Sequence, residues 1–167
     1  MKIKTFVTTI LLSLTLLFLT SSLFAAAAPG TITGTLSRIT TPEGRPKLVV
    51  ITLTCTASAD DNSYPSTVIN TLSGISTYDL RGLRLYSVAT IPGTVGPTDN
   101  SDMVLNDVYG IDIMAGAGAN LIDNTAKNRS VIGITSAVII TGNITIVITS
   151  NAVASAVTTV VLELIGP

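Results

Sequence analysis

The sequence predicts an all-β protein. We expect a single-domain antiparallel β-sandwich of about eight strands, of the jelly-roll or Ig-like type, that follows an N-terminal hydrophobic signal helix. The chain beyond the signal is rich in Thr, Val and Ile, whose branched side chains suit a pleated strand better than a helix. Segments in which apolar and polar residues alternate are separated by loops of Pro, Gly, Asp and Asn, a spacing typical of sandwiches and barrels.

The clearest predicted strand covers 47–57, where apolar residues recur at every second position over eleven residues. One face of this strand carries Val49, Ile51, Leu53, Cys55 and Ala57. The segments 143–149 and 157–165 repeat the pattern, and a loop of small residues joins them. We therefore expect these last two strands to form a hairpin or to lie next to each other.

Five further strands follow the same rule less clearly. They are expected over 31–40, 66–72, 82–89, 102–107 and 130–140. The segment 116–122 is expected to form one short helical turn, and no long amphipathic helix is predicted.

The first 27 residues have the layout of a secretory signal. Lys2 and Lys4 precede an uncharged apolar run over 6–24, which is followed by alanines. Cleavage after Ala27 would leave a domain of 140 residues over 28–167. The alternative is an uncleaved anchor, because the 19-residue run approaches the roughly 20 residues that span a bilayer. We expect a secreted or cell-surface (envelope) protein that touches a membrane only through this segment, if the segment is retained.

The composition excludes several classes of function. The chain has no His and one Cys, so His-based catalysis, His-ligated zinc, zinc-finger and iron–sulfur sites cannot be built from one subunit. Of nine basic residues, Lys2 and Lys4 lie in the predicted signal, which leaves seven against ten acidic residues and a net charge of −3. This mildly acidic surface argues against nucleic acid as a partner. We expect a protein that is not an enzyme.

Cys55 is the only cysteine, so an intrachain disulfide is excluded. Because it alternates with Val49, Ile51 and Leu53, we expect a small buried apolar residue, with a reactive or intermolecular thiol as the alternative.

Acidic residues in turns give one candidate metal site, a calcium site made of Asp99, Asn100 and Asp102. Carboxylate and carbonyl oxygens suit a hard cation, although the spacing matches no recognised calcium loop. The competing interpretation is that these short acids bond to the local backbone of turns. A hydrolase that uses Asp102 and Asp107 as an acid/base pair is a third alternative. Apart from calcium, no cofactor is expected.

From about Leu83 onward the chain resembles small uncharacterised proteins from the structural-gene regions of tailed phages. The shared features here are LRLYSVAT at 83–90, GPTDNSD at 96–102, NDVYGIDIMAGAGAN at 106–120 and ITIVITSNAVASAVTTVVLEL at 144–164. The resemblance implies a β-rich virion component, such as a head or tail accessory protein, and no active residues. The export signal departs from it, because phage head and tail proteins assemble in the cytoplasm.

These observations favour a non-enzymatic exported structural or interaction protein that assembles with itself or decorates a cell-surface or virion-like particle. One alternative is a module that binds carbohydrate or calcium through the loops around 60–64 and 99–106, since loops on a rigid scaffold often carry function. The other is a phage-type virion accessory protein.

Overall fold

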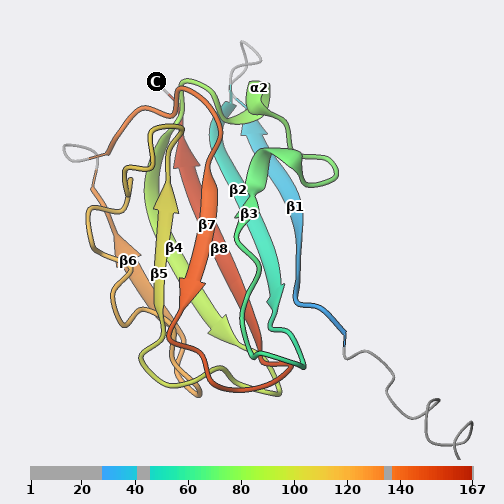
Figure 1. The fold of residues 1–167 in the computed structure, drawn as a ribbon. Helices are drawn as coiled ribbons and strands as arrows, with labels where there is room; N and C mark the ends of the chain where they lie inside the picture. Colours follow the sequence, from blue (N-terminus) through green and yellow to red (C-terminus); the bar gives the residue numbers. More distant parts are fainter. Residues whose placement is uncertain (1–27, 41–45, 134–136, 167) are drawn as a thin grey trace, which may run out of the picture.

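The computed structural model describes residues 28–40, 46–133 and 137–166 (Figure 1). Within them the chain is mostly β, arranged as two antiparallel sheets, which confirms the all-β prediction. The signal helix predicted over 1–27 lies outside the described residues.

In the described ranges, eight strands and two short helical segments make up the fold. In chain order they are β1 (Thr31–Thr40), β2 (Pro46–Thr56), β3 (Thr67–Val68), the 3-10 turn η1 (Ile69–Thr71), α2 (Thr77–Leu80), β4 (Arg84–Pro92), β5 (Asp102–Asn106), β6 (Asn128–Val131), β7 (Thr145–Thr149) and β8 (Val157–Ile165). One sheet has the order β1-β2-β8-β4-β6, and the other has the order β3-β7-β5.

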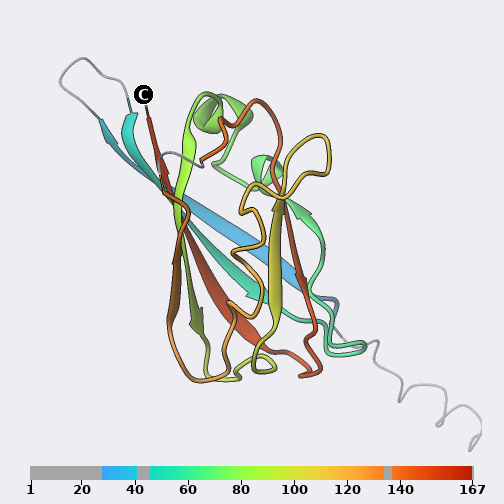
Figure 2. The same cartoon turned by 90° about the vertical axis from the view of Figure 1, so that its left-hand side faces the viewer.

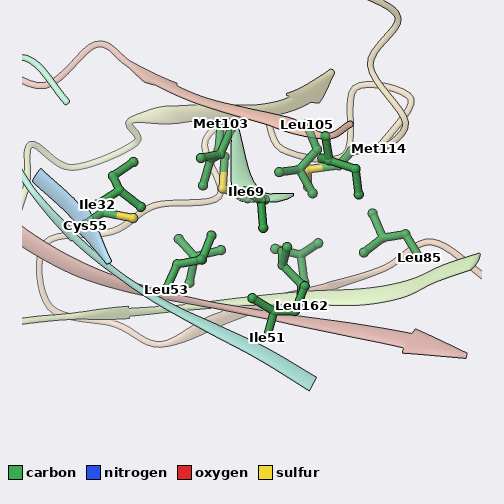
Figure 3. Close-up of a cluster of buried hydrophobic side chains, with 14 of the residues drawn as sticks. Ile32, Ile51, Leu53, Cys55, Ile69, Leu85, Met103, Leu105, Met114 and Leu162 are labelled. Carbon is green, nitrogen blue, oxygen red and sulfur yellow. The ribbon is translucent and has the colours of Figure 1, made fainter. Parts of the chain in front are cut away.

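The two sheets form two layers, as the side view in Figure 2 shows, and their inner faces share one apolar core. From the five-stranded sheet, Ile51, Leu53 and Leu162 are fully buried, and they face Met103 and Leu105 of the smaller sheet (Figure 3). The alternating residues predicted to face inward on β2, β7 and β8 are all buried. The two-residue period therefore assigned the core faces of these strands correctly.

The strand pairings are nested. β2 pairs with β8, β3 pairs with β7 and β4 pairs with β6, all antiparallel. The chain thus runs out and back as one long antiparallel ribbon. Two further pairings, β4 with β8 and β5 with β7, join successive layers of this ribbon into the two sheets.

The irregular segment 112–122 lies at the centre of these nested pairings. It runs along the edge of β5 that is not paired with β7. The amide of Met103 donates to the carbonyl of Gly118 at 3.0 Å, and the amide of Ile113 donates to Leu105 at 2.8 Å. Consecutive turns take the place of the helical turn predicted over 116–122. Positive φ angles at Gly116 (82°) and Asn120 (52°) reverse the chain locally, so a helix cannot continue.

Several predicted boundaries shift. The strand predicted over 66–72 is limited to β3, because the chain turns into η1 at Ile69, and the one predicted over 130–140 ends at Val131. Gly133, with φ of 76°, turns the chain out of the sheet there. The four-residue helix α2 was not predicted.

The predicted hairpin between the last two strands is wrong. β7 lies in the three-stranded sheet and β8 in the five-stranded sheet, so the loop between them crosses from one layer to the other (Figure 1). Ser150 and Ser155 both adopt positive φ angles in this loop. Each strand still buries its apolar face, but the two faces meet the core from opposite sides.

We predict that Ile51→Ala lowers the free energy of unfolding by about 2–5 kcal/mol, because it leaves a cavity between the layers. Thr54→Ser on the same strand is the control. Its side chain faces solvent, so the change should stay within about 0.5 kcal/mol. Equilibrium denaturation in urea measures both values, and equal effects would contradict the assigned inner face of β2.

Candidate functional site

One end of the two layers collects exposed apolar side chains. It is formed by α2 and by the segments 107–111 and 137–143, which lie together at the top of Figure 1. Contacts link the three parts. The hydroxyl of Thr77 donates to the side-chain oxygen of Asn143 at 3.2 Å, and the amide of Gly82 donates to the carbonyl of Ile140 at 2.8 Å.

The loop 107–111 turns its carboxylate inward and its apolar side chains outward. One oxygen of Asp107 accepts the amides of Tyr109 at 2.8 Å and of Ile111 at 2.9 Å. This use of a short acid is typical of turns. Tyr109 is 80% exposed and Ile111 is 62% exposed, although both carry large apolar side chains.

α2 presents a second tyrosine. The carboxylate of Asp79 accepts the amide and the hydroxyl of Ser76, both at 2.9 Å, and also pairs with Arg38 of β1. With the start of the helix fixed in this way, Leu80 points into the core and Tyr78 points outward, 90% exposed. Tyr78 is the most exposed of the large apolar residues in the described part of the chain.

The segment 137–143 adds two aliphatic residues. The amide of Ile140 donates to the carbonyl of Leu83 at 2.9 Å, which holds Ile140 in the core while Val138 and Ile139 face outward. The segment also touches the neighbouring loop at Gly142. A Cβ at this position would lie 2.5 Å from Cγ1 of Val108, so a larger residue would displace the Val108 side chain.

We call this set the apolar end. It consists of Tyr78, Val108, Tyr109, Ile111, Val138 and Ile139, each at least 46% exposed. The described chain enters at the opposite end of the layers, where residue 28 precedes β1 (Figure 1). The apolar end and residue 28 thus lie at opposite ends of the layers.

Sequence reasoning did not identify the apolar end. The available signal was the occurrence of large apolar residues within turn sequences, as in Asp107-Val108-Tyr109-Gly110. A large apolar side chain in a turn at the surface has few neighbours to pack against, so it stays exposed. The position of these residues next to Thr77 and Asn143 depends on contacts between distant segments, which no local pattern contains.

The loops proposed for ligand binding are only partly brought together. The loops at 60–64 and 97–101 meet at the end opposite the apolar end, where the side chain of Asn151 joins them. Its oxygen accepts the amide of Thr98 at 2.9 Å, and its nitrogen donates to the carbonyl of Asn62 at 2.6 Å. Asn106, which closes the second predicted loop, lies at the other end of β5.

The residues of the predicted calcium site lie in the turn before β5 and at its first residue. Asp99 and Asn100 are exposed, while the carboxylate of Asp102 accepts the amide of Asn120 at 2.8 Å and the hydroxyl of Ser150 at 3.3 Å. These donors occupy oxygens that a cation would need. In the described part of the chain, no three acidic, His or Cys side chains are grouped to hold a metal. The calcium site stays a prediction.

Asp102 and Asp107 do not form an acid/base pair. They lie at opposite ends of β5, and five residues of extended chain span about 17 Å. The carboxylates of a glycosidase are separated by about 5–9.5 Å. The hydrolase alternative is therefore wrong for this pair.

Cys55 is fully buried, as predicted. Desolvation raises the pKa of its thiol to about 12, so the thiolate is scarce at neutral pH. The side chain acts as a small apolar member of the core.

A polar cluster crosses the outer face of the five-stranded sheet. The hydroxyl of Ser87 donates to Oε2 of Glu163 at 2.5 Å, and Nη1 of Arg129 donates to the same oxygen at 2.7 Å. These bonds tie β4, β8 and β6 together. Ser87 has no exposed surface, so an external substrate cannot reach it, and the cluster is better suited to holding the sheet together.

No protein-family model matches the chain, and no curated protein or solved structure is significantly similar to it. Within the described ranges, no helix is both long enough and apolar enough to span a bilayer.

We predict that Glu163→Gln lowers the free energy of unfolding at neutral pH but has little effect at acidic pH. The hydrogen bond from Ser87, followed by that from Arg129, lowers the pKa of Glu163 in the folded protein. A carboxyl group whose pKa is lowered in the folded protein stabilises the fold at pH values above its unfolded pKa, which is about 4.3. This stabilisation is lost as the pH falls through the pKa of the folded state. Urea titrations at pH 7 should show a loss of about 1 kcal/mol in the variant. The difference should shrink below pH 4, whereas a constant difference would contradict the assignment.

Proposed function

We propose that this chain is a non-enzymatic, exported structural or interaction protein whose apolar end docks onto a larger protein assembly at a cell surface or on a particle. The observation that supports it is the apolar end, where two tyrosines and four aliphatic residues are exposed together. Tyrosine offers a large rigid apolar surface with one polar group, which is why it is enriched at protein interfaces.

The orientation of the domain supports the same role. If the N-terminal segment directs export, or stays as an anchor, it enters at the end of the layers opposite the apolar end. The apolar end would then face away from the membrane, toward neighbouring molecules. A virion accessory role of phage type is the special case in which the assembly is a phage head or tail.

The nested pairings favour the jelly-roll type over the Ig-like type. A jelly roll is a long antiparallel ribbon wrapped into two sheets, so its first strand pairs with its last, and so on inward. Counted from β2, the pairs β2 with β8, β3 with β7 and β4 with β6 follow this order, and 112–122 lies beside β5 in place of a further strand. β1 is an added strand at the edge of β2. Ig-like domains instead place their first, second, fifth and fourth strands in one sheet.

The docking role predicts that the double variant Tyr109→Ser, Ile111→Ser loses most of its binding to the assembly. Both side chains are exposed, so the fold should be unchanged, and two interface anchors contribute roughly tenfold or more to binding. The measurement is the share of the full chain that sediments with envelope or particle material after detergent has dissolved the membrane. The detergent separates docking from anchoring by the N-terminal segment.

Val95→Ser is the matched control. Val95 is also exposed, at 46%, but it lies in a loop near β8's first residue, at the other end of the layers. The proposal fails if the wild-type chain does not sediment, or if the double variant sediments as the control does. A calcium-dependent rise in Tm, with sedimentation unaffected by the double variant, would favour the loop-based binding module instead.

A further inference from the structure

β1 is a long edge strand with regular pairing on one side only. It pairs with β2 over all ten residues, Thr31–Thr40, and it is the last strand of the five-stranded sheet. Its outer-face side chains, from Thr31 to Ser37, are exposed. An edge of this kind offers unpaired peptide groups to another strand.

The other sheet edges are short or covered. β6 has four residues and β3 has two, and the edge of β5 is covered by 112–122. Natural proteins also protect edges with proline, lysine or a bulge. Between Thr31 and Ile39, β1 contains no proline or lysine. Its one charged residue, Arg38, is paired with Asp79 of α2, and its one irregularity lies at Ile39/Thr40. In the described chain, β1 is thus the one long regular edge left open.

The peptide groups on this edge follow from the ladder. The amide of Ala57 donates to the carbonyl of Ala156 in the direction of β8. The peptide groups of successive residues in a strand point to opposite sides. Odd-numbered residues of β2, like Ala57, therefore bond to β8, and even-numbered residues of β2 bond to odd-numbered residues of β1. The peptide groups of the even-numbered residues of β1 therefore face outward. They belong to Ile32, Gly34, Leu36 and Arg38.

We propose that this edge pairs, antiparallel and about a two-fold axis, with the same edge of a second copy of the chain. When Thr35 lies opposite its own copy, Ile32 faces Arg38 and Gly34 faces Leu36. In this register all four edge residues of each copy meet an edge residue of the other, so every outward amide and carbonyl finds a partner. The two five-stranded sheets become one.

Side chains and charges are compatible with this pairing. In the same register the outer face places Thr33 opposite Ser37 of the second copy, a pair that can hydrogen-bond. The only charged residue of β1, Arg38, already pairs with Asp79 of its own chain and faces an apolar residue across the interface. No like charges meet. A two-fold contact that uses the one open edge also closes, giving a dimer instead of a fibre.

This inference goes beyond the proposed docking role, because it concerns another surface and another partner. The test is sedimentation velocity of the full chain, as processed by the cell, over a range of concentrations. The wild type should sediment as a dimer. Thr35→Lys and Thr35→Glu each bring like charges together at the two-fold axis, and should weaken dimerisation roughly tenfold or more. An equal mixture of the two variants should dimerise again.

Two further variants complete the test. Thr54→Lys places the same charge on the exposed outer face of β2, away from the edge, and should leave the dimer intact. Leu36→Pro removes an outward amide and should weaken the dimer in any register, with circular dichroism confirming the fold. A monomeric wild type, or a dimer that survives both Thr35→Lys and Leu36→Pro, would overturn the proposal. Loss in Leu36→Pro alone would overturn the register.

The double variant Tyr109→Ser, Ile111→Ser separates this inference from the docking role. Its changes lie at the apolar end, so the variant should dimerise like the wild type even when it no longer sediments with the assembly. If instead it becomes a monomer, the copies associate through the apolar end, and the edge-to-edge proposal is overturned.

Discussion

The fold depends on the antiparallel pairing of β8 with two partners at once. β8 lies between β2 and β4 in the five-stranded sheet, and its inward residues Val160, Leu162 and Leu164 have no exposed surface. A central strand of this kind must satisfy its peptide groups on both edges and bury one face against the other layer. The last strand in the sequence therefore pairs with strands that precede it by about 75 and 110 residues.

This long-range pairing gathers the connecting loops at two ends of the domain, and the two ends differ in how their loops are held. Because the ribbon wraps as a whole, its connecting loops gather at two ends, one bound together by Asn151 and the other carrying the apolar end. In the first, polar side chains hold the loops to one another. In the second, short acids such as Asp107 and Asp79 bond to their own loops, and large apolar side chains are left outside. Loops held by their own hydrogen bonds have less conformational freedom to lose on binding, which favours the proposed docking role.

Local patterns were sufficient for the long strands β1, β2 and β8 and for the buried faces of β2, β7 and β8. β1 and β8 have the predicted bounds, and the inward residues of β2 and β7 follow the two-residue period. The partner of each strand could not be predicted, because β7 and β8 carry similar patterns and only the shared core decides which sheet each one joins. The short helix at Thr77 and the end of β6 at Val131 depend on turn geometry over one or two residues, which composition describes poorly.

The candidate surfaces were harder to predict than the fold for a related reason. Acidic residues in turns suggested ligand sites, but Asp102 and Asp107 accept backbone amides and serve the loops around them. The exposed tyrosines carry no motif, and the open edge of β1 becomes visible only when the other edges are known. Both proposed interaction surfaces therefore follow from topology, with the proposed jelly roll placing one at an end and the other along a side.

The pairing of β8 with β2 is tested most directly by nuclear Overhauser effects in the folded protein. In the register described, Thr52 with Val161 and Thr54 with Thr159 are non-hydrogen-bonded pairs, whose α-protons approach closely. Strong α-proton contacts are expected for both pairs, and none between β7 and β8. α-Proton contacts between β7 and β8, as in a terminal hairpin, would contradict the nested arrangement on which the account rests.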